Sequence, residues 1–282
     1  MTQQWRDRLG RLGIWRPVGQ VTPNLAAGIE GLGYSAIWLG GSPAADLAVV
    51  DGLLDATTTL VVATGVVNMW QADPREVATS FARIEADHPG RFLLGVGAGH
   101  REATQQYARP YEVLADYVDV LTDSGVPHGS LILAALGPRM LRLAAERTAG
   151  AHPYLVTPDY TRLAREILGA EPLLATEHKA VIEPDPQAAR AIGRRRVASP
   201  YLGLVNYTAN LKRLGWTDAD LADGGSDALI DALVAHGDPA HVAEQLGEHL
   251  VAGADHVCVQ LLAPSGADPL EGYRRLAGPL GL

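Results

Sequence analysis

The chain has 282 residues, 47% hydrophobic and 20% charged, which is enough apolar material for one large globular domain. Its formal net charge of −9 argues against sequence-independent binding to nucleic acid or to an anionic membrane. The single cysteine, Cys258, excludes an intramolecular disulfide, and its apolar neighbours predict a buried core thiol. No stretch is long enough to span a bilayer, and the first residues lack an uninterrupted apolar segment, so we expect a cytoplasmic protein.

Short apolar runs that predict β-strands recur along the chain. They cover residues 12–15, 34–39, 60–67, 91–97, 131–136, 151–156, 174–182 and 256–262. Between them, a side chain that can cap a helix is repeatedly followed by proline, which predicts a helix N-terminus. These pairs are Thr22-Pro23, Ser42-Pro43, Asp73-Pro74, Thr157-Pro158, Asp185-Pro186, Asp238-Pro239 and Asp268-Pro269.

Regular alternation of strands and helices predicts parallel βαβ units, and eight strands predict an α/β fold of the (β/α)8 barrel type. We expect one domain over residues 1–282. About seventy residues separate the last two strands, which predicts a helical insertion at about 197–235, before the last βα unit. A doubly wound open sheet is the alternative, but the dinucleotide fingerprint GxGxxG is absent, because His100 stands where the last glycine of residues 95–100 is needed.

Small residues gather at the predicted carboxyl ends of the strands, where barrels of this type carry their chemistry. They are Gly40-Gly41, Gly65, Gly97-Ala98-Gly99 and Ala134-Ala135. Glycine at one strand end is explained by a tight turn. Glycine at several neighbouring ends favours contact between the backbone and a flat ligand.

The predicted helix at 138–147 differs from the others, because Gly137 before Pro138 has no side chain that could cap it. The free N–H groups of Arg139 and Met140 would form an anion site, to which the Arg139 side chain adds positive charge. A turn capped by water is the alternative.

Several catalytic motifs are missing. Residues 100–107, HREATQQY, do not form an HExxH zinc motif, no GxSxG nucleophile elbow occurs, and acidic residues are scattered. We expect no metal site.

An ordered set of segments carries a resemblance over nearly the whole chain. They are GYSAIWLGGSP (33–43), LVVATGVVNMW (60–70), GRFLLGVGAGH (90–100), the stretch 133–161, VNYTANLKRLGW (205–216) and GADHVCVQLL (253–262). Together they resemble the luciferase-like flavin/deazaflavin oxidoreductases, and within these an actinobacterial branch assigned to coenzyme F420.

The resemblance implies a coenzyme F420-dependent oxidoreductase that transfers a hydride between the deazaflavin and a small organic substrate. It also implies a homodimer formed through outer barrel helices. Two alternatives stay open: an FMN-dependent luciferase-like monooxygenase, and a barrel that binds a flavin or deazaflavin without catalysis. Titration with F420 and with FMN separates the first two.

The resemblance also assigns residues to the cofactor. It implies a non-proline cis peptide at Gly65–Val66 behind the central ring of the cofactor, and an Asn68 amide near its polar edge. The proposed ring site comprises Gly40, Gly41, Gly65, Val66, Asn68, Gly97, Gly99 and His100, and the phosphate site comprises Gly137, Pro138, Arg139 and Met140. Lys212 and Arg213 either meet an anionic tail or form a solvated helix face.

The residue that handles the proton is less clear from the sequence. Relatives place a histidine after strand two and a glutamate after strand four, where this chain has Gly41 and the run Gly99-His100-Arg101-Glu102. His100 and His152 are the candidates, since imidazole titrates near neutrality. Substrate contacts are expected from Trp70 and Tyr154. Trp38 is read as cavity or core, and His178 as a hydrogen-bonding residue at a strand end.

Overall fold

The computed structural model describes residues 2–100, 109–263 and 266–282. A closed ring of eight parallel strands forms its centre: β1 (Leu12–Pro17), β2 (Ala36–Gly40), β3 (Val61–Thr64), β5 (Phe92–Gly97), β6 (Leu131–Leu133), β7 (Gly150–Ala151), β8 (Leu173–Ile182) and β10 (His256–Leu261). Strand β10 pairs with both β8 and β1, which closes the ring. The predicted (β/α)8 barrel is confirmed.

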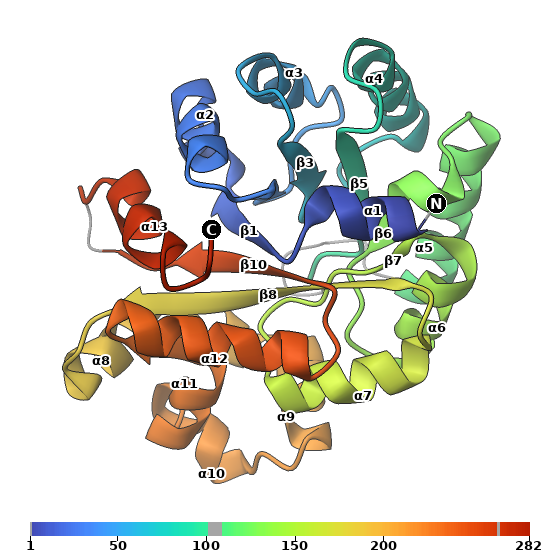
Figure 1. Ribbon diagram of the computed structural model, residues 1–282. Coiled ribbons are helices and arrows are strands. Elements are labelled where there is room, and N and C mark those ends of the chain that lie inside the picture. Colours follow the sequence, from blue (N-terminus) through green and yellow to red (C-terminus); the bar gives the residue numbers. More distant parts are fainter. Residues whose placement is uncertain (1, 101–108, 264–265) are drawn as a thin grey trace.

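Helices surround this ring (Figure 1). They are α2 (Pro23–Gly31), α3 (Ala48–Asp55), α4 (Pro74–Asp87), α5 (Pro110–Asp123), α6 (Pro138–Arg147), α7 (Pro158–Leu168), α8 (Pro186–Ala198), α12 (Pro239–Val251) and α13 (Pro269–Ala277). Six of the seven predicted capping pairs are confirmed, because their side chains accept backbone N–H groups of the first turn. Local chemistry therefore sets most helix starts.

The seventh pair, Ser42-Pro43, does not begin a helix, and this prediction is wrong. Ser42 has φ +55° and follows Gly41 at φ +81°, whereas an N-cap residue needs an extended backbone. Helix α3 instead begins at Ala48, whose N–H lies 3.2 Å from Asp46 Oδ1. The chain thus makes a turn after β2.

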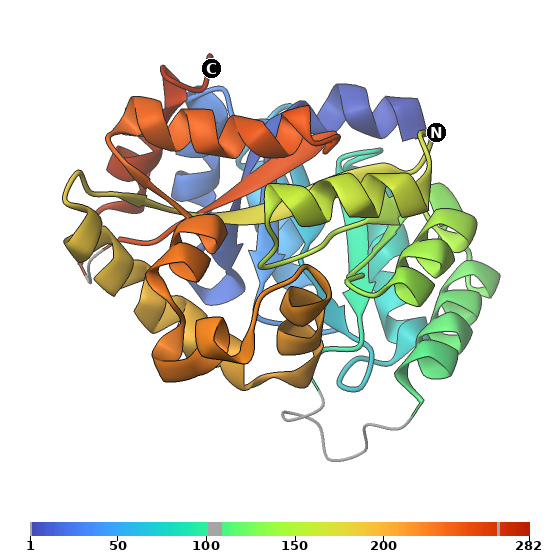
Figure 2. The ribbon, with the colours of Figure 1, turned by 90° about the horizontal axis from the view of Figure 1, so that it is seen from below.

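An N-terminal helix that the sequence did not predict, α1 (Thr2–Leu9), covers the end of the barrel at which the strands begin. Trp5 and Leu9 are buried among residues of the barrel interior. The indole N–H of Trp5 donates to the carbonyl of Gly129, just before β6. Figure 2 shows α1 at one end of the barrel and α9–α11 toward the other.

Between β8 and β10 lie α9 (Val205–Arg213), α10 (Asp218–Leu221), α11 (Asp227–Leu233) and β9 (Val234–Gly237). Strand β9 was not predicted. It pairs with the second half of β8, from Lys179 onward, whereas β7 pairs only with the first two residues of β8. Strand β9 therefore occupies the edge that the early end of β7 leaves open.

Two apolar layers result from strand alternation, in which successive side chains point to opposite faces. One layer packs between the strands and the helices, and a smaller one fills the barrel. Trp38 lies inside, fully buried, and stacks on His152 with ring centroids 4.2 Å apart, so it is a core residue. Cys258 is a buried free thiol as predicted, 3.2 Å from the Thr176 carbonyl. No helix in the described ranges is long and apolar enough to cross a bilayer.

Candidate functional site

The loop between β3 and β4 (Val67–Asn68) lies at the end of the barrel where the strands finish. Its Gly65–Val66 peptide bond is cis, and both residues are half-buried. Strand β4 continues the barrel wall, because Val67 and Asn68 pair with Val96 and Gly97 of β5. The loop is therefore held between two strands.

At two of the glycines predicted to contact the cofactor, neighbouring side chains leave no room for a Cβ atom. A Cβ atom at Gly40 would overlap the indole of Trp15, and one at Gly97 would lie 2.8 Å from both Val66 and Ala134. Gly41 is different, since it is exposed and no atom would lie within 4 Å of a Cβ there. Gly41 alone of these three glycines leaves open space.

Asn68 and Trp70 connect the loops after β4 and β5. Asn68 Oδ1 accepts the backbone N–H of Trp70 at 3.0 Å, and Trp70 Nε1 donates to the Ala98 carbonyl at 2.8 Å. Gly99, at φ +59°, leaves room for the Asn68 amide, which a Cβ atom there would approach to 2.8 Å. The side-chain oxygen of Asn68 thus binds the backbone of its own loop, and Trp70 is half-buried.

Helix α6 begins as expected, with Gly137 extended at its N-cap and no side-chain cap. No atom lies within 4 Å of the position that a Cβ of Gly137 would take. The Arg139 guanidinium lies 3.9 Å from the Tyr111 ring centroid and 3.4 Å from Glu112 Oε1, so α5 shares its charge. Pro138 is the first helical residue, and Met140 packs half-buried against the core.

His152 follows β7 and is buried. Its Nδ1 lies 2.8 Å from the Ala175 carbonyl, and Nδ1 must donate this hydrogen bond because a carbonyl only accepts. Burial lowers the pKa of His152 to about 4, so the ring is neutral at pH 7 and Nε2 carries no proton. Nε2 has no hydrogen-bond partner among the described residues, and a Cβ at Gly65 would lie 3.0 Å from it.

Trp15 brings a second such nitrogen to the same place. Its Nε1–H is buried, lacks a partner within the described part of the chain, and would also lie 3.0 Å from a Cβ at Gly65. Gly65 therefore faces an unused acceptor on His152 and an unused donor on Trp15. The sequence does not predict this role of Trp15, because nothing in the run LGIW indicates which distant residues it meets.

Aromatic and charged side chains lie next to Trp15, whose ring centroid is 5.1 Å from that of Tyr154. The Tyr154 hydroxyl lies 2.8 Å from both the Tyr201 hydroxyl and Gln260 Oε1. Beneath it, Lys179 Nζ lies 3.0 Å from Glu177 Oε1 and 3.9 Å from the Tyr154 ring centroid, and neither charged side chain is exposed. A signal for this pair existed, since Glu177 and Lys179 stand two apart in a strand and so share a face.

His100 is half-buried after β5, with its ring 5.5 Å from that of Tyr207 on α9. The next residues of its run, Arg101 and Glu102, lie outside the described residues. His178 lies 3.3 Å from the Val156 carbonyl and 2.9 Å from His249 Nε2, and burial lowers its pKa to about 4. His178 is thus a hydrogen-bonding residue, as expected.

The side chains of Lys212 and Arg213 bind residues in or near their own helix, α9. Lys212 forms an ion pair with Asp218, and Arg213 Nη1 lies 3.1 Å from Asn210 Oδ1. These contacts favour a solvated helix face over an anion site.

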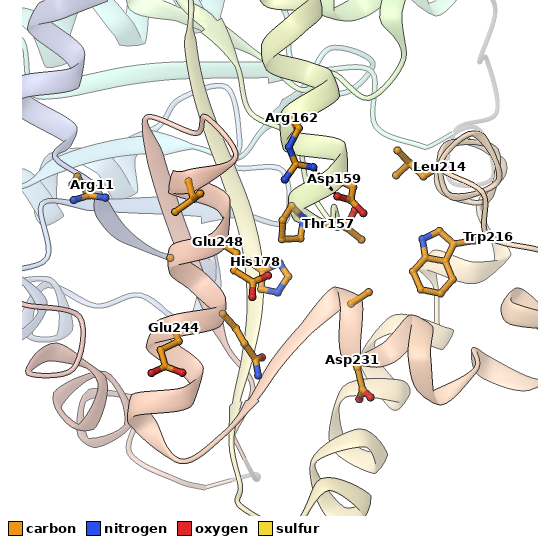
Figure 3. Close-up of a pocket in the computed structure, with 15 residues that line it drawn as sticks. Arg11, Thr157, Asp159, Arg162, His178, Leu214, Trp216, Asp231, Glu244 and Glu248 are labelled. Carbon is orange, nitrogen blue, oxygen red and sulfur yellow. Dashed lines mark hydrogen bonds and ion pairs between the residues drawn. The ribbon is translucent and has the colours of Figure 1, made fainter.

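Two large cavities open on the surface, and neither includes a residue predicted to bind the cofactor. The first, about 770 Å³, has its acidic side chains on three helices: Asp159 on α7, Asp231 on α11, and Glu244 and Glu248 on α12 (Figure 3). The second, about 760 Å³, lies at the ends of β1 and β10 and includes Trp15. The part of the chain that the structure describes holds no group of three or more metal-ligating side chains.

The sequence and the fold both resemble those of known proteins. The family described as luciferase-like monooxygenase matches residues 17–124. An F420-dependent secondary alcohol dehydrogenase, solved with an F420-acetone adduct, has a TM-score of 0.74 at 15% identity, covering 96% of this chain and 98% of that chain. Comparison with curated proteins gives no significant match.

Two further structures share the fold. The F420-dependent tetrahydromethanopterin reductase from Methanopyrus kandleri has a TM-score of 0.68 at 17% identity, over 96% of this chain and 98% of that chain. The oxygenating constituent of 3,6-diketocamphane monooxygenase from Pseudomonas putida, in complex with FMN, has a TM-score of 0.67 at 14% identity, over 96% of both chains. The resemblance is thus confirmed: residues 17–124 match the luciferase-like monooxygenase family, and nearly the whole chain shares the fold of F420-dependent oxidoreductases and luciferase-like monooxygenases.

Proposed function

We propose that this protein is an oxidoreductase that binds coenzyme F420 where the barrel strands end and exchanges a hydride between the deazaflavin and a small organic substrate. The observation that carries the proposal is the unpaired donor of Trp15 beside the unpaired acceptor of His152, both facing Gly65. Buried polar atoms normally have hydrogen-bond partners, so two unpartnered atoms facing one place call for an explanation, and a bound ligand supplies one.

These two nitrogens suit the polar edge of a flavin-type ring, which alternates carbonyl oxygens with an N–H group. Trp15 would donate to a carbonyl, and the unprotonated His152 Nε2 would accept an N–H. Gly65 and Val66 would lie against the ring, and the exposed Gly41 leaves room beside it. The bound deazaflavin supplies the hydride chemistry, and the protein supplies orientation.

The phosphate group fits the start of α6. The first N–H groups of an uncapped helix bind anions, and the helix dipole favours negative charge there. Arg139 would add charge, although Glu112 offsets part of it. Most other barrel helices use a side-chain cap at this position, so α6 is suited to an external anion.

Proton exchange with the substrate requires a further group. We assign it to His100, which is half-buried beyond β5, because the neutral His152 is directed toward Gly65. The half-buried Trp70 and Tyr154 would limit the substrate space.

An FMN-dependent monooxygenase is the second candidate. It is favoured by the match of residues 17–124 to a monooxygenase family and by the shared fold with the FMN-bound monooxygenase constituent. A non-catalytic barrel that binds the same cofactors is the third.

Fluorescence titration with F420 and with FMN tests the proposal. We expect saturable binding of F420, tighter than that of FMN, and at least tenfold weaker binding in Gly137→Asp, whose carboxylate would occupy the phosphate position. Thr22→Asp is the matched control, since it adds the same charge to the already capped start of α2. Tighter binding of FMN would favour the second candidate. Absence of binding by either cofactor, or equal affinities in both variants, would overturn the site.

A further inference from the structure

The second cavity, of about 760 Å³, is lined by residues of which the proposed function uses only Trp15. It lies at the carboxyl ends of β1 and β10, bounded by α8 and by the chain before α13. Its polar side chains include those of Arg16, Gln20, Arg195, Arg196, Ser199 and Gln260. Trp15 and Gln260 connect it to the interior, since Trp15 faces Gly65 and Gln260 binds the Tyr154 hydroxyl.

The charges in this cavity are all of one sign. Three arginines line it, and no acidic side chain does so among the described residues. The first cavity has nearly the same volume, but there Arg162 lies 2.8 Å from Asp159. In a protein of formal net charge −9, a cavity lined by arginines without acids is unexpected unless an anion occupies it.

Arg16 gives a second, independent indication. Its Nη2 donates to Gln20 Oε1 at 2.8 Å and its guanidinium also interacts with the buried Tyr273 hydroxyl, but its buried Nε has no hydrogen-bond partner within the described ranges. An arginine that binds a carboxylate or phosphate commonly uses two N–H groups at once. The Nε–H is therefore an unsatisfied donor on a side chain that lines this cavity.

The charge of Arg196 also reaches the barrel interior. Burial lowers the pKa of Lys179 to about 8, Glu177 opposes this shift, and Arg196 adds to it. Arg196 is thus a positive charge close enough to Lys179 to act on it.

Resting on the proposed function, we infer that this cavity binds the negatively charged group of the substrate, so that the substrate is an organic anion carrying a carboxylate or phosphate. Strand β1 lies four strands from β6 in either direction around the eight-strand ring, so the cavity and the start of α6 are on opposite sides. One anion site therefore suits the cofactor and the other suits a second ligand. The acidic tail of the deazaflavin is the competing source of the same chemistry.

Calorimetric titration of the protein with inorganic phosphate and with benzoate tests the inference. We expect saturable binding that weakens with salt, and at least tenfold weaker binding in Arg16→Gln and Arg196→Gln. The matched control is Arg162→Gln, which removes an arginine from the other cavity and should bind both anions as the unaltered protein does. Absence of saturable binding, or equal affinity in all three variants, would overturn the anion site.

Titration of the same variants with F420 separates the two sources. Unchanged F420 affinity in Arg16→Gln and Arg196→Gln supports a substrate anion. A parallel loss of F420 affinity would assign the cavity to the cofactor tail and overturn the substrate assignment. If the unaltered protein binds the anions but neither F420 nor FMN, the proposed function fails while the anion site remains.

Discussion

The two halves of the barrel end are built from opposite kinds of residues. From β2 to β6, the strand ends carry glycine and alanine, and the side chains there leave backbone partly exposed. From β7 through β8 and β10 to β1, the end is filled by tyrosines, a buried ion pair and arginines. Under the proposed function, the open half would lie against a flat ring, whose polar edge Trp15 and His152 would bind, and the filled half would recognise charge and shape.

Acid should have the largest effect, through buried histidines. These include His152 after β7, His178 within β8 and His256 at the start of β10, and burial lowers the pKa of each to about 4. Between pH 6.5 and pH 4 the unfolded chain binds more protons than the folded one, so the free energy of unfolding falls as the pH falls. We expect each histidine to contribute about 1.4 kcal/mol per pH unit.

Urea denaturation at pH 7, 6 and 5 measures this slope. His256→Asn should reduce the slope of the unfolding free energy against pH by the contribution of one histidine. This holds even if the variant is less stable at pH 7, because the missing imidazole no longer takes up a proton on unfolding. An exposed histidine provides the control in His241→Asn, which should leave the slope unchanged. A slope that His256→Asn does not alter would contradict the assignment.

The buried ion pair should give the next largest effect. Lys179→Met leaves the Glu177 carboxylate buried without its partner, and breaking such a pair costs about 3–5 kcal/mol. The double variant Glu177→Gln/Lys179→Met removes both charges, and the amide oxygen introduced at position 177 keeps an acceptor for the Leu155 N–H that Glu177 now binds. Denaturation should therefore show the double variant to be more stable than Lys179→Met alone, and the reverse order would refute this account.

The open half should respond to added volume. Gly97→Ala places a methyl group 2.8 Å from Val66 and Ala134, and such overpacking costs about 1–3 kcal/mol. It should also weaken F420 binding, because Val66 must move toward the proposed ring. Gly278→Ala meets no atom within 4 Å and serves as the control. Equal stability and cofactor affinity for the two variants would remove the distinction between the halves.

Local signals predicted much of the fold. Helix starts were read from residue pairs such as Asp238-Pro239, because a cap and its helix are adjacent in the chain. Helix α1 and strand β9 were missed for the opposite reason. Trp5 and Leu9 of α1 are buried against strands that are distant in the sequence, and β9 forms where β7 stops early.

The site was predictable to a similar degree. The missing cap at Gly137 is a local feature, and the structure has it. Gly40 and Gly97 were read as ligand contacts, but their size is explained by the Trp15, Val66 and Ala134 side chains packed on them. The meeting of Trp15 with His152 at Gly65 depends on three strands folding together, and no pattern within one segment encodes it.

Helix α1 has a consequence for the order of events. Because α1 covers the end at which the strands begin, with Trp5 and Leu9 packed among the interior residues, ligands would reach the site from the end at which the strands finish. Of two ligands bound there, the deeper one would bind first and dissociate last, because the outer ligand would block its exit. Steady-state kinetics would then show an ordered mechanism, in which the inner ligand stays bound while the outer ligand exchanges.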